Sequence, residues 1–400
     1  MRSQNTADAA DDALPAPDGG RPTDIVLVGG GHAHVHVLKA FGDQPLAGSR
    51  VTLISRDLMT PYSGMMPGVV CGFYRYDEAH IDLAALATAN GARLVHGDAV
   101  GLDREGKRVI LASGLSVRYD VVSIDVGIGP DLGSIAGAAE HGIAVKPIAS
   151  FLVKLERLRA DARAGLVRHV VAVGGGAAGV ELVLAVRTRL IADAVAERRD
   201  VRRFTFTLVT AEELLASHNA RVRAAFRRIL AARGVALHEG RPVAAITADH
   251  VRMGDGMLIP ADATLVTTNA AAPAWFERTG LALDRGGFLA VGPTLQVISD
   301  ADVFAAGDCA ELIETPREKS GVFAVRAGPP LAGNLRRRAR GQAPVPWWPQ
   351  SRHLSLITTG ERYVVASRGR FKAEGAWLWT AKDWLDRRWM RAYRVDASAL

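Results

Sequence analysis

The stretch TDIVLVGGGHAH, residues 23–34, decides the fold of this 400-residue chain. Thr23 to Val28 is a short apolar run, typical of a buried strand, and it leads directly into three glycines and a helical stretch. A second strand is predicted at Arg50 to Ile54. Strand, glycine turn, helix and strand in this order predict a dinucleotide-binding βαβ unit.

The same layout recurs later in the chain. Arg168 to Val173 predicts a strand, Gly174 to Gly176 the turn, Ala177 to Arg189 a helix, and Phe204 to Val209 the next strand. The length of the chain also favours two or three domains. We therefore expect an α/β protein with two Rossmann-like dinucleotide-binding domains.

The first loop, Gly29-x-Gly31-x-x-His34, departs from the usual glycine pattern. Its first glycine permits a tight turn, and the second lets the backbone approach a diphosphate at the helix N-terminus. His34 takes the place of the third small residue, and Ser55 and Arg56 replace the acidic residue expected on the ribose. A glycine turn in a nucleotide-free α/β domain is the alternative. The candidate cofactor contacts are Gly29, Gly31, His32, Ala33, Ser55 and Arg56.

Three histidines, His32, His34 and His36, raise the question of a metal site. Alternate residues lie on opposite sides of a helix, so only His32 and His36 share a face. No carboxylate or cysteine lies beside them at ligand spacing. We predict no metal, and expect histidines packed beside a cofactor.

The second loop, Gly174-x-Gly176-x-x-Gly179-Val180-Glu181, carries all three glycines. The ribose-reading position lies near Thr210, and Glu212 and Glu213 follow it. A 2′-phosphate would meet these two carboxylates, so NAD is slightly favoured over NADP, and the choice stays open. The candidate contacts are Gly174, Gly176, Ala177, Gly179 and Thr210.

Composition excludes several classes of protein. The two cysteines, Cys71 and Cys309, are far apart, so neither a local redox disulfide nor a cysteine zinc site is available. The net charge of +7 suits phosphate-bearing ligands, anionic lipid or nucleic acid, but zinc-finger spacing and aromatic RNA-binding motifs are missing. We predict no nucleic-acid partner, no membrane-spanning helix, a disordered leader over residues 1–22 without a secretory signal, and a cytoplasmic location.

With Val303-Phe304-Ala305-Ala306-Gly307-Asp308 downstream, the chain resembles the two-dinucleotide-binding-domain flavoproteins, the pyridine nucleotide–disulfide oxidoreductase superfamily. The resemblance implies that the first loop, Gly307 and Asp308 hold FAD, while Gly174, Gly176, Gly179 and Glu181 face NAD(P)H. It further implies an FAD domain at 23–150 and 280–343, an inserted NAD(P)H domain at 151–279, and a C-terminal region at 344–400.

Within this superfamily the chain resembles type II NADH dehydrogenases and, more closely, flavoproteins associated with selenide water dikinase. The shared motifs are Thr60 to Gly68, His218 to Val222, Lys319 to Arg326 and Lys382 to Arg388.

Three departures from the family stand beside this resemblance. The family's Ala-Thr-Gly strand ends are Asp125-Val126-Gly127 and Thr268-Asn269-Ala270 here, and Asn269 replaces a glycine close to NAD(P). Gly127 and Asn269 remain candidate cofactor contacts. The glutamine-rich stretch that borders quinone in type II NADH dehydrogenases is replaced by Gly321 to Arg326.

The resemblance implies hydride transfer from NAD(P)H through FAD to an acceptor. The missing cysteine pair excludes a disulfide acceptor and disfavours sulfide:quinone chemistry. The resemblance to type II NADH dehydrogenases implies, by analogy, a quinone as the acceptor. Tyr62, Ser63 and Gly64 are candidates to border the isoalloxazine ring, Glu181 to orient the carboxamide, and Lys319 to stabilise charge on the reduced ring. A packed tyrosine and a surface lysine are the alternatives for Tyr62 and Lys319.

Two other functions stay open. One is a flavoprotein that acts on selenium or sulfur species in selenophosphate supply. The other is a non-catalytic FAD-binding redox sensor, in which the departures at His34, Ser55 and Asn269 mark lost turnover.

The C-terminal segment predicts an amphipathic helix within Gly375 to Tyr393 that mixes tryptophans with basic residues. Such a helix suits a lipid headgroup interface. Packing on its own FAD domain or on the second subunit of a homodimer is the alternative.

Overall fold

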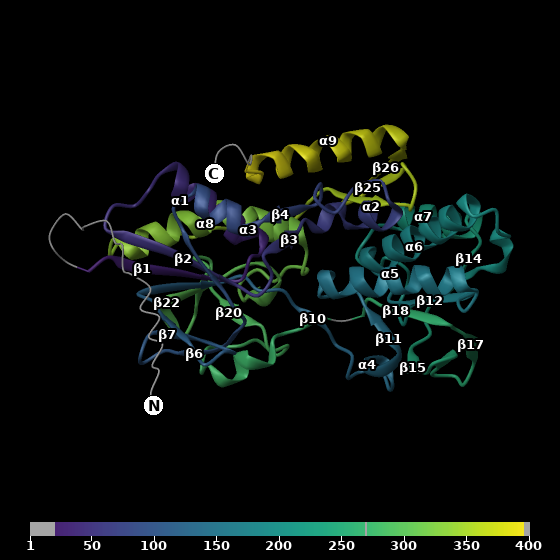
Figure 1. The fold of residues 1–400 in the computed structure, drawn as a ribbon, viewed down its shortest axis with the longest axis horizontal. Helices are drawn as coiled ribbons and strands as arrows, with labels where there is room; N and C mark the ends of the chain where they lie inside the picture. The colour runs from purple at the N-terminus through teal and green to yellow at the C-terminus, as the bar shows by residue number, and fades with distance from the viewer. Residues whose placement is uncertain (1–20, 269, 396–400) are drawn as a thin grey trace, which may run out of the picture.

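The structure is a computed structural model that describes residues 21–268 and 270–395. Most of the predicted leader and the candidate contact Asn269 therefore lie outside the described residues. The rest of the chain forms two α/β units side by side, and a C-terminal helix runs along one side of them (Figure 1). The predicted pair of Rossmann-like domains is confirmed.

The first unit is built on an eight-stranded sheet whose central strands β9, β1 and β2 are parallel. In spatial order its strands are β23 (Ala310–Leu312), β20 (Leu289–Val291), β21 (Gln296–Val297), β22 (Asp300–Ala305), β9 (Val121–Ile124), β1 (Thr23–Val28), β2 (Ser49–Ser55) and β5 (Arg93–His96). Strand β1 has the bounds that the sequence predicts.

Both faces of this sheet are covered, which explains the continuous apolar run of β1. Ile25 and Leu27 pack into one core with helices α1 (His32–Asp43), α8 (Gly321–Ala339) and α3 (Leu83–Ala89). Val26 and Val28 pack into a second core on the other face, which they share with residues of the small sheet β6 (Ala99–Asp103), β7 (Arg108–Leu111) and β8 (Ser116–Arg118). Strands β6 and β7 lie on the side of the large sheet away from α1 and α8 (Figure 1). The alternation of side chains along β1 thus divides its apolar residues between two cores.

The second unit is a five-stranded parallel sheet in the order β11 (Gly142–Ala144), β18 (Ala263–Val266), β12 (His169–Val173), β13 (Thr205–Val209) and β14 (Val235–His238). Its helices are α5 (Ile148–Ala164), α6 (Ala177–Ala196), α7 (Ala220–Ala232) and the short α4 (Ala138–His141), and β15 (Val243–Ile246), β16 (His250–Met253) and β17 (Leu258–Pro260) form a side sheet. Strand β11 belongs to this sheet although it precedes the boundary predicted at residue 151.

The chain passes between the units through two short antiparallel strands, β10 (Gly129–Pro130) and β19 (Ala270–Ala271). A second short pair, β3 (Met59–Pro61) and β4 (His80–Asp82), flanks the 3₁₀ turn η1 (Ser63–Met65) and helix α2 (Met66–Cys71). Helix α2 packs on α6, so this insert of the first unit reaches the second.

The C-terminal region forms an antiparallel sheet, β24 (Ser355–Thr358), β25 (Val364–Arg368) and β26 (Phe371–Gly375), followed by α9 (Ala376–Tyr393). The helix observed at α9 lies within the segment predicted from the sequence, Gly375 to Tyr393. Ile357 and Val365 join the core of the second unit, while Val364 and Ala366 join that of the first. The small sheet therefore connects the two units.

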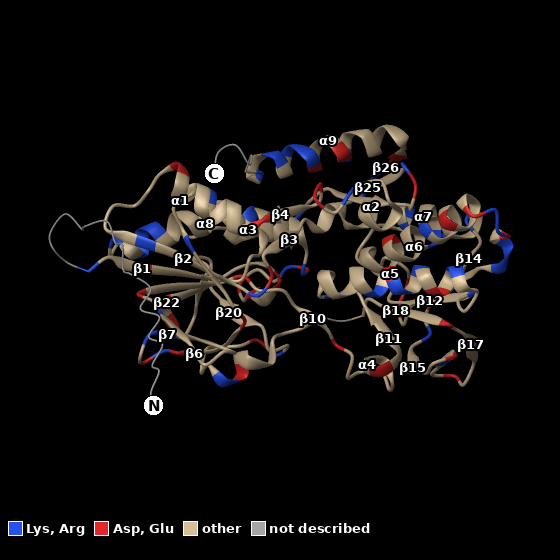
Figure 2. Cartoon of the chain, viewed as in Figure 1, with Lys and Arg blue, Asp and Glu red and all other residues tan. Residues whose placement is uncertain are grey.

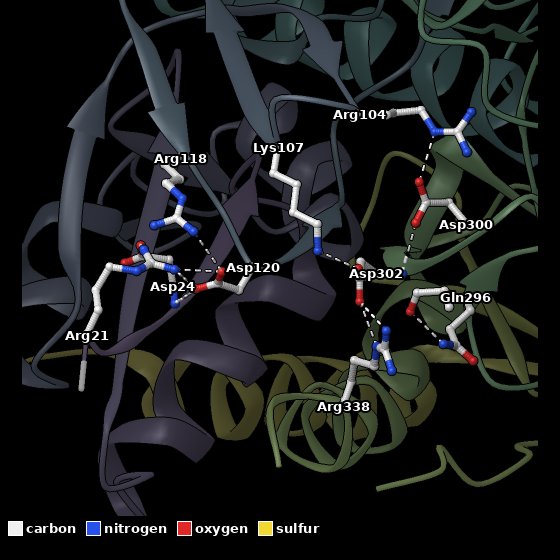
Figure 3. Close-up of polar contacts among 11 residues, drawn as sticks. Arg21, Asp24, Arg104, Lys107, Arg118, Asp120, Gln296, Asp300, Asp302 and Arg338 are labelled. Carbon is white, nitrogen blue, oxygen red and sulfur yellow. Dashed lines mark hydrogen bonds and ion pairs between the residues drawn. The ribbon is translucent and has the colours of Figure 1, made fainter. Parts of the chain in front are cut away.

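Ion pairs lie at the starts of the strands β1, β9 and β22, the edge opposite the glycine loop (Figure 3). Arg21 binds Asp24 at 2.6 Å and Asp120 at 2.7 Å, and Asp302 binds both Lys107 and Arg338 at 2.6 Å. Because parallel strands carry ligands at their carboxyl ends, these pairs are structural.

No helix among the described residues combines the length and the apolar character that crossing a membrane requires.

Candidate active site

The first glycine loop lies at the carboxyl end of β1 and opens helix α1. Gly29 has a φ of +96°, and a Cβ there would lie 2.4 Å from the Asp125 backbone oxygen. A Cβ on Gly31 would lie 2.2 Å from the Asp125 carboxylate. Both positions therefore require glycine for steric reasons.

The histidine at the third motif position has a defined structural role. The His34 Nδ1 lies 2.7 Å from the Gly29 carbonyl oxygen, and its Nε2 lies 2.8 Å from the Ser123 hydroxyl. Burial lowers the pKa of His34 to about 4, so the ring is neutral at physiological pH. The buried imidazole therefore connects the glycine loop to β9.

The other two histidines face α9. His36 Nδ1 lies 3.0 Å from the Tyr393 hydroxyl, and the ring of His32 lies 5.5 Å from those of Tyr62 and Trp389. Across the described residues, no three His, Cys, Asp or Glu side chains gather as a metal site would need.

Asp125, which follows β9, reaches the N-terminus of α1. Its Oδ2 accepts the backbone N–H of Ala33 at 2.8 Å and that of His34 at 3.1 Å, and its backbone oxygen accepts the N–H of Gly31 at 3.1 Å. The sequence marks Asp125 only as a departure from Ala-Thr-Gly. Its contact with α1 spans 92 residues of chain, and no local pattern could have predicted it.

Gly307 and Asp308 form the 3₁₀ turn η4 (Gly307–Cys309) beside the first loop. Gly307 has a φ of +70°, and a Cβ there would lie 2.2 Å from Asp125 Oδ1. Asp308 and Lys319 line one pocket, together with Ser320 of the loop before α8.

Both charged residues of this pocket have partners. Lys146, which lies between β11 and α5 of the second unit, binds Asp308 at 2.7 Å. The Lys319 ammonium binds Glu311 at 2.6 Å and the Ala310 carbonyl oxygen at 2.5 Å, and it lies over the ring of Phe288. The ammonium of Lys319, which is predicted to stabilise charge on the reduced flavin ring, is therefore already ion-paired with Glu311.

The loop that carries Tyr62, Ser63 and Gly64 lies between α8 and α9. The Tyr62 ring stacks on Trp389 with centroids 4.2 Å apart and planes at 21°. A Cβ on Gly321, the first residue of α8, would lie 2.5 Å from the Ser63 hydroxyl. The Gly64 carbonyl oxygen accepts a 2.6 Å hydrogen bond from Lys382 of α9.

A buried ion pair lies in the middle of α9. Lys382 and Asp386 are both buried and lie 2.5 Å apart. Burial raises the pKa of Asp386, which Lys382 and Tyr62 act to lower. Burial also raises the pKa of the Tyr62 hydroxyl, with the Asp386 carboxylate as the next cause, so Tyr62 stays protonated. Sequence reasoning places Lys382 in a motif but misses its contact with the Gly64 loop.

The second glycine loop satisfies the steric demands of its motif. A Cβ on Gly179 would lie 1.9 Å from the Gly174 carbonyl oxygen, and one on Gly175 would lie 2.4 Å from the Thr210 hydroxyl. A Cβ on Gly176 would meet nothing within 4 Å. The open space at Gly176, at the start of α6, is where a diphosphate would lie.

Glu181 points toward the C-terminal sheet. Its Oε1 accepts the backbone N–H of Thr358 at 2.7 Å and the Thr358 hydroxyl at 2.8 Å. Burial raises the pKa of Glu181, while Thr358 and then Lys382 act to lower it. Glu181 is thus brought near Lys382 and the Gly64 loop, and its predicted contact with the carboxamide stays a prediction.

The remaining candidates divide into buried and exposed positions. Ser55 is buried, and its hydroxyl donates to the Asp57 carbonyl oxygen at 2.7 Å. Arg56 is exposed beside Asp57, and Gly127 is also exposed. Thr210 is buried at the end of β13. Of these, Thr210 borders the second loop directly.

The residues present fit FAD at the first loop and a nicotinamide dinucleotide at the second. Both loops lie at the carboxyl ends of parallel strands, where open α/β sheets bind ligands. The buried Nε2 of His32 and Nε1 of Trp389, beside the first loop, and the buried hydroxyl of Thr268, beside the second, have no hydrogen-bond partner among the described residues. Buried polar atoms normally have partners, so these three atoms are candidates to contact a ligand.

Comparison with known proteins agrees with this geometry. The model of the pyridine nucleotide-disulphide oxidoreductase family matches residues 23–328. The chain is 25% identical over 312 residues to ferroptosis suppressor protein 1 of Xenopus tropicalis, covering 72% of this chain and 75% of that protein. It is 28% identical over 231 residues to an NADH dehydrogenase-like protein of Mycobacterium tuberculosis, covering 55% of this chain and 56% of that one. The NDH2 structure of Plasmodium falciparum superposes with a TM-score of 0.80 at 13% identity, covering 93% of this chain and 97% of that one.

Proposed function

Because this chain belongs to the pyridine nucleotide-disulphide oxidoreductase family, whose members use FAD with NAD(P)H, we propose that it passes electrons from NAD(P)H through FAD to a quinone. The observation that carries the proposal is the pair of glycine loops, each opening a helix at the carboxyl end of a parallel sheet. FAD supplies the hydride and electron chemistry. The chain supplies binding, orientation and exclusion of water.

The second loop binds the electron donor in this proposal. The first-turn amides of α6 and the open position at Gly176 receive the diphosphate. Glu212 and Glu213 are exposed beyond β13, and carboxylates there would repel a 2′-phosphate, which supports NADH over NADPH.

The cysteines support an acceptor other than a disulfide. Cys71 and Cys309 are both free and buried. Burial raises the pKa of Cys71 to about 12, so its thiol is neutral and a poor nucleophile. The resemblance to type II NADH dehydrogenases favours a quinone as the acceptor. The stacked rings of Tyr62 and Trp389, beside the loop that carries Ser63 and Gly64, also suit a planar apolar acceptor.

The outer face of α9 supports contact with a membrane surface. Trp377 and Trp384 are 64% and 53% exposed, and Leu385 is exposed beside them. The guanidinium of Arg388 lies over the Trp384 ring, and basic residues gather on the C-terminal half of the helix (Figure 2). Aromatic and basic residues on one helix face suit an interface with anionic lipid. The inner face of α9 packs on the core of the first unit. Contact with a membrane would therefore involve only the outer face.

A spectroscopic titration tests the enzymatic proposal. Purified protein is made anaerobic and titrated with NADH and, separately, with NADPH, while flavin absorbance is followed. We expect bleaching by NADH, with a weaker or slower response to NADPH, and recovery of the colour when a soluble quinone is added. Recovery with dioxygen or a ferredoxin but not with quinone would reject the quinone, and a flavin that stays oxidised would favour the redox-sensor reading.

Liposome co-sedimentation tests the membrane contact. The variant Trp377→Ser/Trp384→Ser/Leu385→Ser should lose binding to vesicles that contain anionic lipid. A matched control replaces exposed apolar residues elsewhere, Leu115→Ser and Leu258→Ser, and should keep it. Equal sedimentation of the two variants would reject α9 as the contact.

A further inference from the structure

The first-turn amides of α1, where a diphosphate is expected, are already bound by a carboxylate of the chain. Asp125 Oδ2 takes the N–H groups of Ala33 and His34, and the Asp125 side chain lies against Gly31 and Gly307. Asp125 is 3% exposed. In the described part of the chain the N–H of His32 is left without a partner in this turn. A helix N-terminus favours one anion, and two anions there repel each other.

The second loop offers an internal comparison. Thr267 follows β18 as Asp125 follows β9, and each lies against the first glycine of its loop. Thr267 is neutral, and its hydroxyl donates to the Val173 carbonyl oxygen at 3.0 Å. In the described part of the chain, no side chain accepts the first-turn N–H groups of α6, whose N-cap residue is Gly176. Among the described residues, a carboxylate therefore lies at the helix start of the first loop and not of the second.

The groups around Asp125 do not neutralise its charge. His32 and His34 of α1 are neutral, because burial lowers the pKa of each to about 4. On η4, Asp308 is a second carboxylate, and burial keeps the Cys309 thiol protonated. The nearby cations are bound elsewhere: Lys146 to Asp308, and Lys319 to Glu311.

This environment favours the protonated acid. Burial raises the pKa of Asp125 to about 7, the N–H donors of His34 and Ala33 act to lower it, and the charge of Asp308 raises it further. A diphosphate brought to the same amides adds negative charge close by, which favours the neutral acid still more.

We propose that Asp125 is protonated in the FAD complex and ionised in the free protein at alkaline pH, so that FAD binding takes up one proton. Asp125 is then a specificity-determining residue of the cofactor site that couples retention of FAD to pH. The coupling rests on FAD binding through α1 and is independent of the electron acceptor.

Release of FAD from the purified holoprotein tests this coupling. Free FAD fluoresces more than bound FAD, so the dissociation constant is measured by dilution at fixed pH between 6 and 9. We expect a constant value below neutral pH and a rise of up to about tenfold per pH unit above it. At pH 8.5 the constant should exceed its acidic value by up to about thirtyfold.

The variant Asp125→Asn isolates the carboxyl group. Asparagine keeps the size of the protonated acid, and its amide oxygen accepts the same N–H groups. This variant should bind FAD with little pH dependence, and at pH 8.5 up to about thirtyfold more tightly than the unmodified protein. The exposed Asp98→Asn is the matched control and should keep the pH dependence of the unmodified chain.

Calorimetry of the unmodified protein gives a second measurement that needs no variant. Binding heats in two buffers of different ionisation enthalpy report the protons exchanged. Uptake of close to one proton per FAD at pH 8.5 supports the proposal, and an uptake of zero overturns it. Equal pH slopes for Asp125→Asn and the unmodified chain overturn it as well. A protein that binds no FAD at any pH would instead refute the proposed function.

Discussion

Replacing Gly176 with alanine should weaken NADH binding at the second loop and leave FAD binding at the first loop unchanged. The added Cβ meets nothing within 4 Å, and Gly176 has a φ of −72° and a ψ of 176°, which alanine adopts readily. The fold should therefore tolerate the methyl group. It would, however, occupy the space through which the α6 backbone approaches a diphosphate.

The expected loss follows from the contacts that the methyl group prevents. One hydrogen bond to a charged group contributes about 1.5–3 kcal/mol. Loss of one such bond raises the dissociation constant of NADH roughly 10- to 150-fold. FAD content and thermal stability should stay unchanged, because the first loop lies on a separate sheet.

Stopped-flow reduction of the flavin at increasing NADH concentrations measures this effect. The NADH concentration that gives half-maximal reduction should rise roughly 10- to 150-fold. Gly333→Ala, in the interior of α8 and also free of neighbours within 4 Å, is the matched control and should behave like the unmodified protein. An unchanged NADH dependence in Gly176→Ala would show that the donor does not bind at α6.

Three further changes test the packing around the first loop. Unfolded His34 binds a proton near its ordinary pKa of 6.5, whereas folded His34 binds one only near pH 4. The free energy of unfolding should therefore fall by up to about 3 kcal/mol as the pH drops from 6.5 to 4. Urea unfolding of His34→Ala should show a smaller fall over the same pH range. Lys382→Met leaves Asp386 buried without its cation and should lower the free energy of unfolding by about 3–5 kcal/mol. The double variant Lys382→Met/Asp386→Leu should regain most of this free energy, because no unpaired charge remains buried. Trp389→Ala removes the ring stacked on Tyr62 and should cost about 2–4 kcal/mol in the same assay, whereas the exposed Trp384→Ala should change stability by under about 0.5 kcal/mol.

Local sequence patterns predict the two glycine loops and their flanking strands because the determinants are close together. A strand buried on both faces needs a continuous apolar run, and the turn after it needs glycine at positive φ. The bounds of β1 follow from these two demands alone. Strands β10, β11 and β19 have two or three residues each and no periodicity, so the sequence does not reveal which sheet they join.

The side-chain partners of the site are less predictable because they depend on distant segments. Glu181 was placed from its motif, but its hydrogen bonds go to Thr358, 177 residues away. Tyr62 was placed at the flavin, and its stacking partner comes from α9. Lys319 is predicted from the resemblance to stabilise charge on the flavin ring, and the carboxylate that pairs with it belongs to Glu311 of β23. In each case the residue type indicates a place in the site, but the sequence does not reveal which distant residue the side chain contacts.

The two loops also differ in how they would hold their ligands. At the first, the unpartnered ring nitrogens of His32 and Trp389 are buried, and the Trp389 ring of α9 lies 5.5 Å from that of His32. At the second, Gly176 is exposed, and no side chain of residues 21–268 and 270–395 caps the start of α6. A ligand enclosed by a helix leaves only when that helix yields, while one bound at an open loop exchanges freely. If FAD and NAD(P)H bind at these loops, this contrast favours retention of the ligand at the first loop and exchange at the second. Asp125 lies only at the first, where a proton-dependent affinity would govern cofactor content and leave donor binding unaffected.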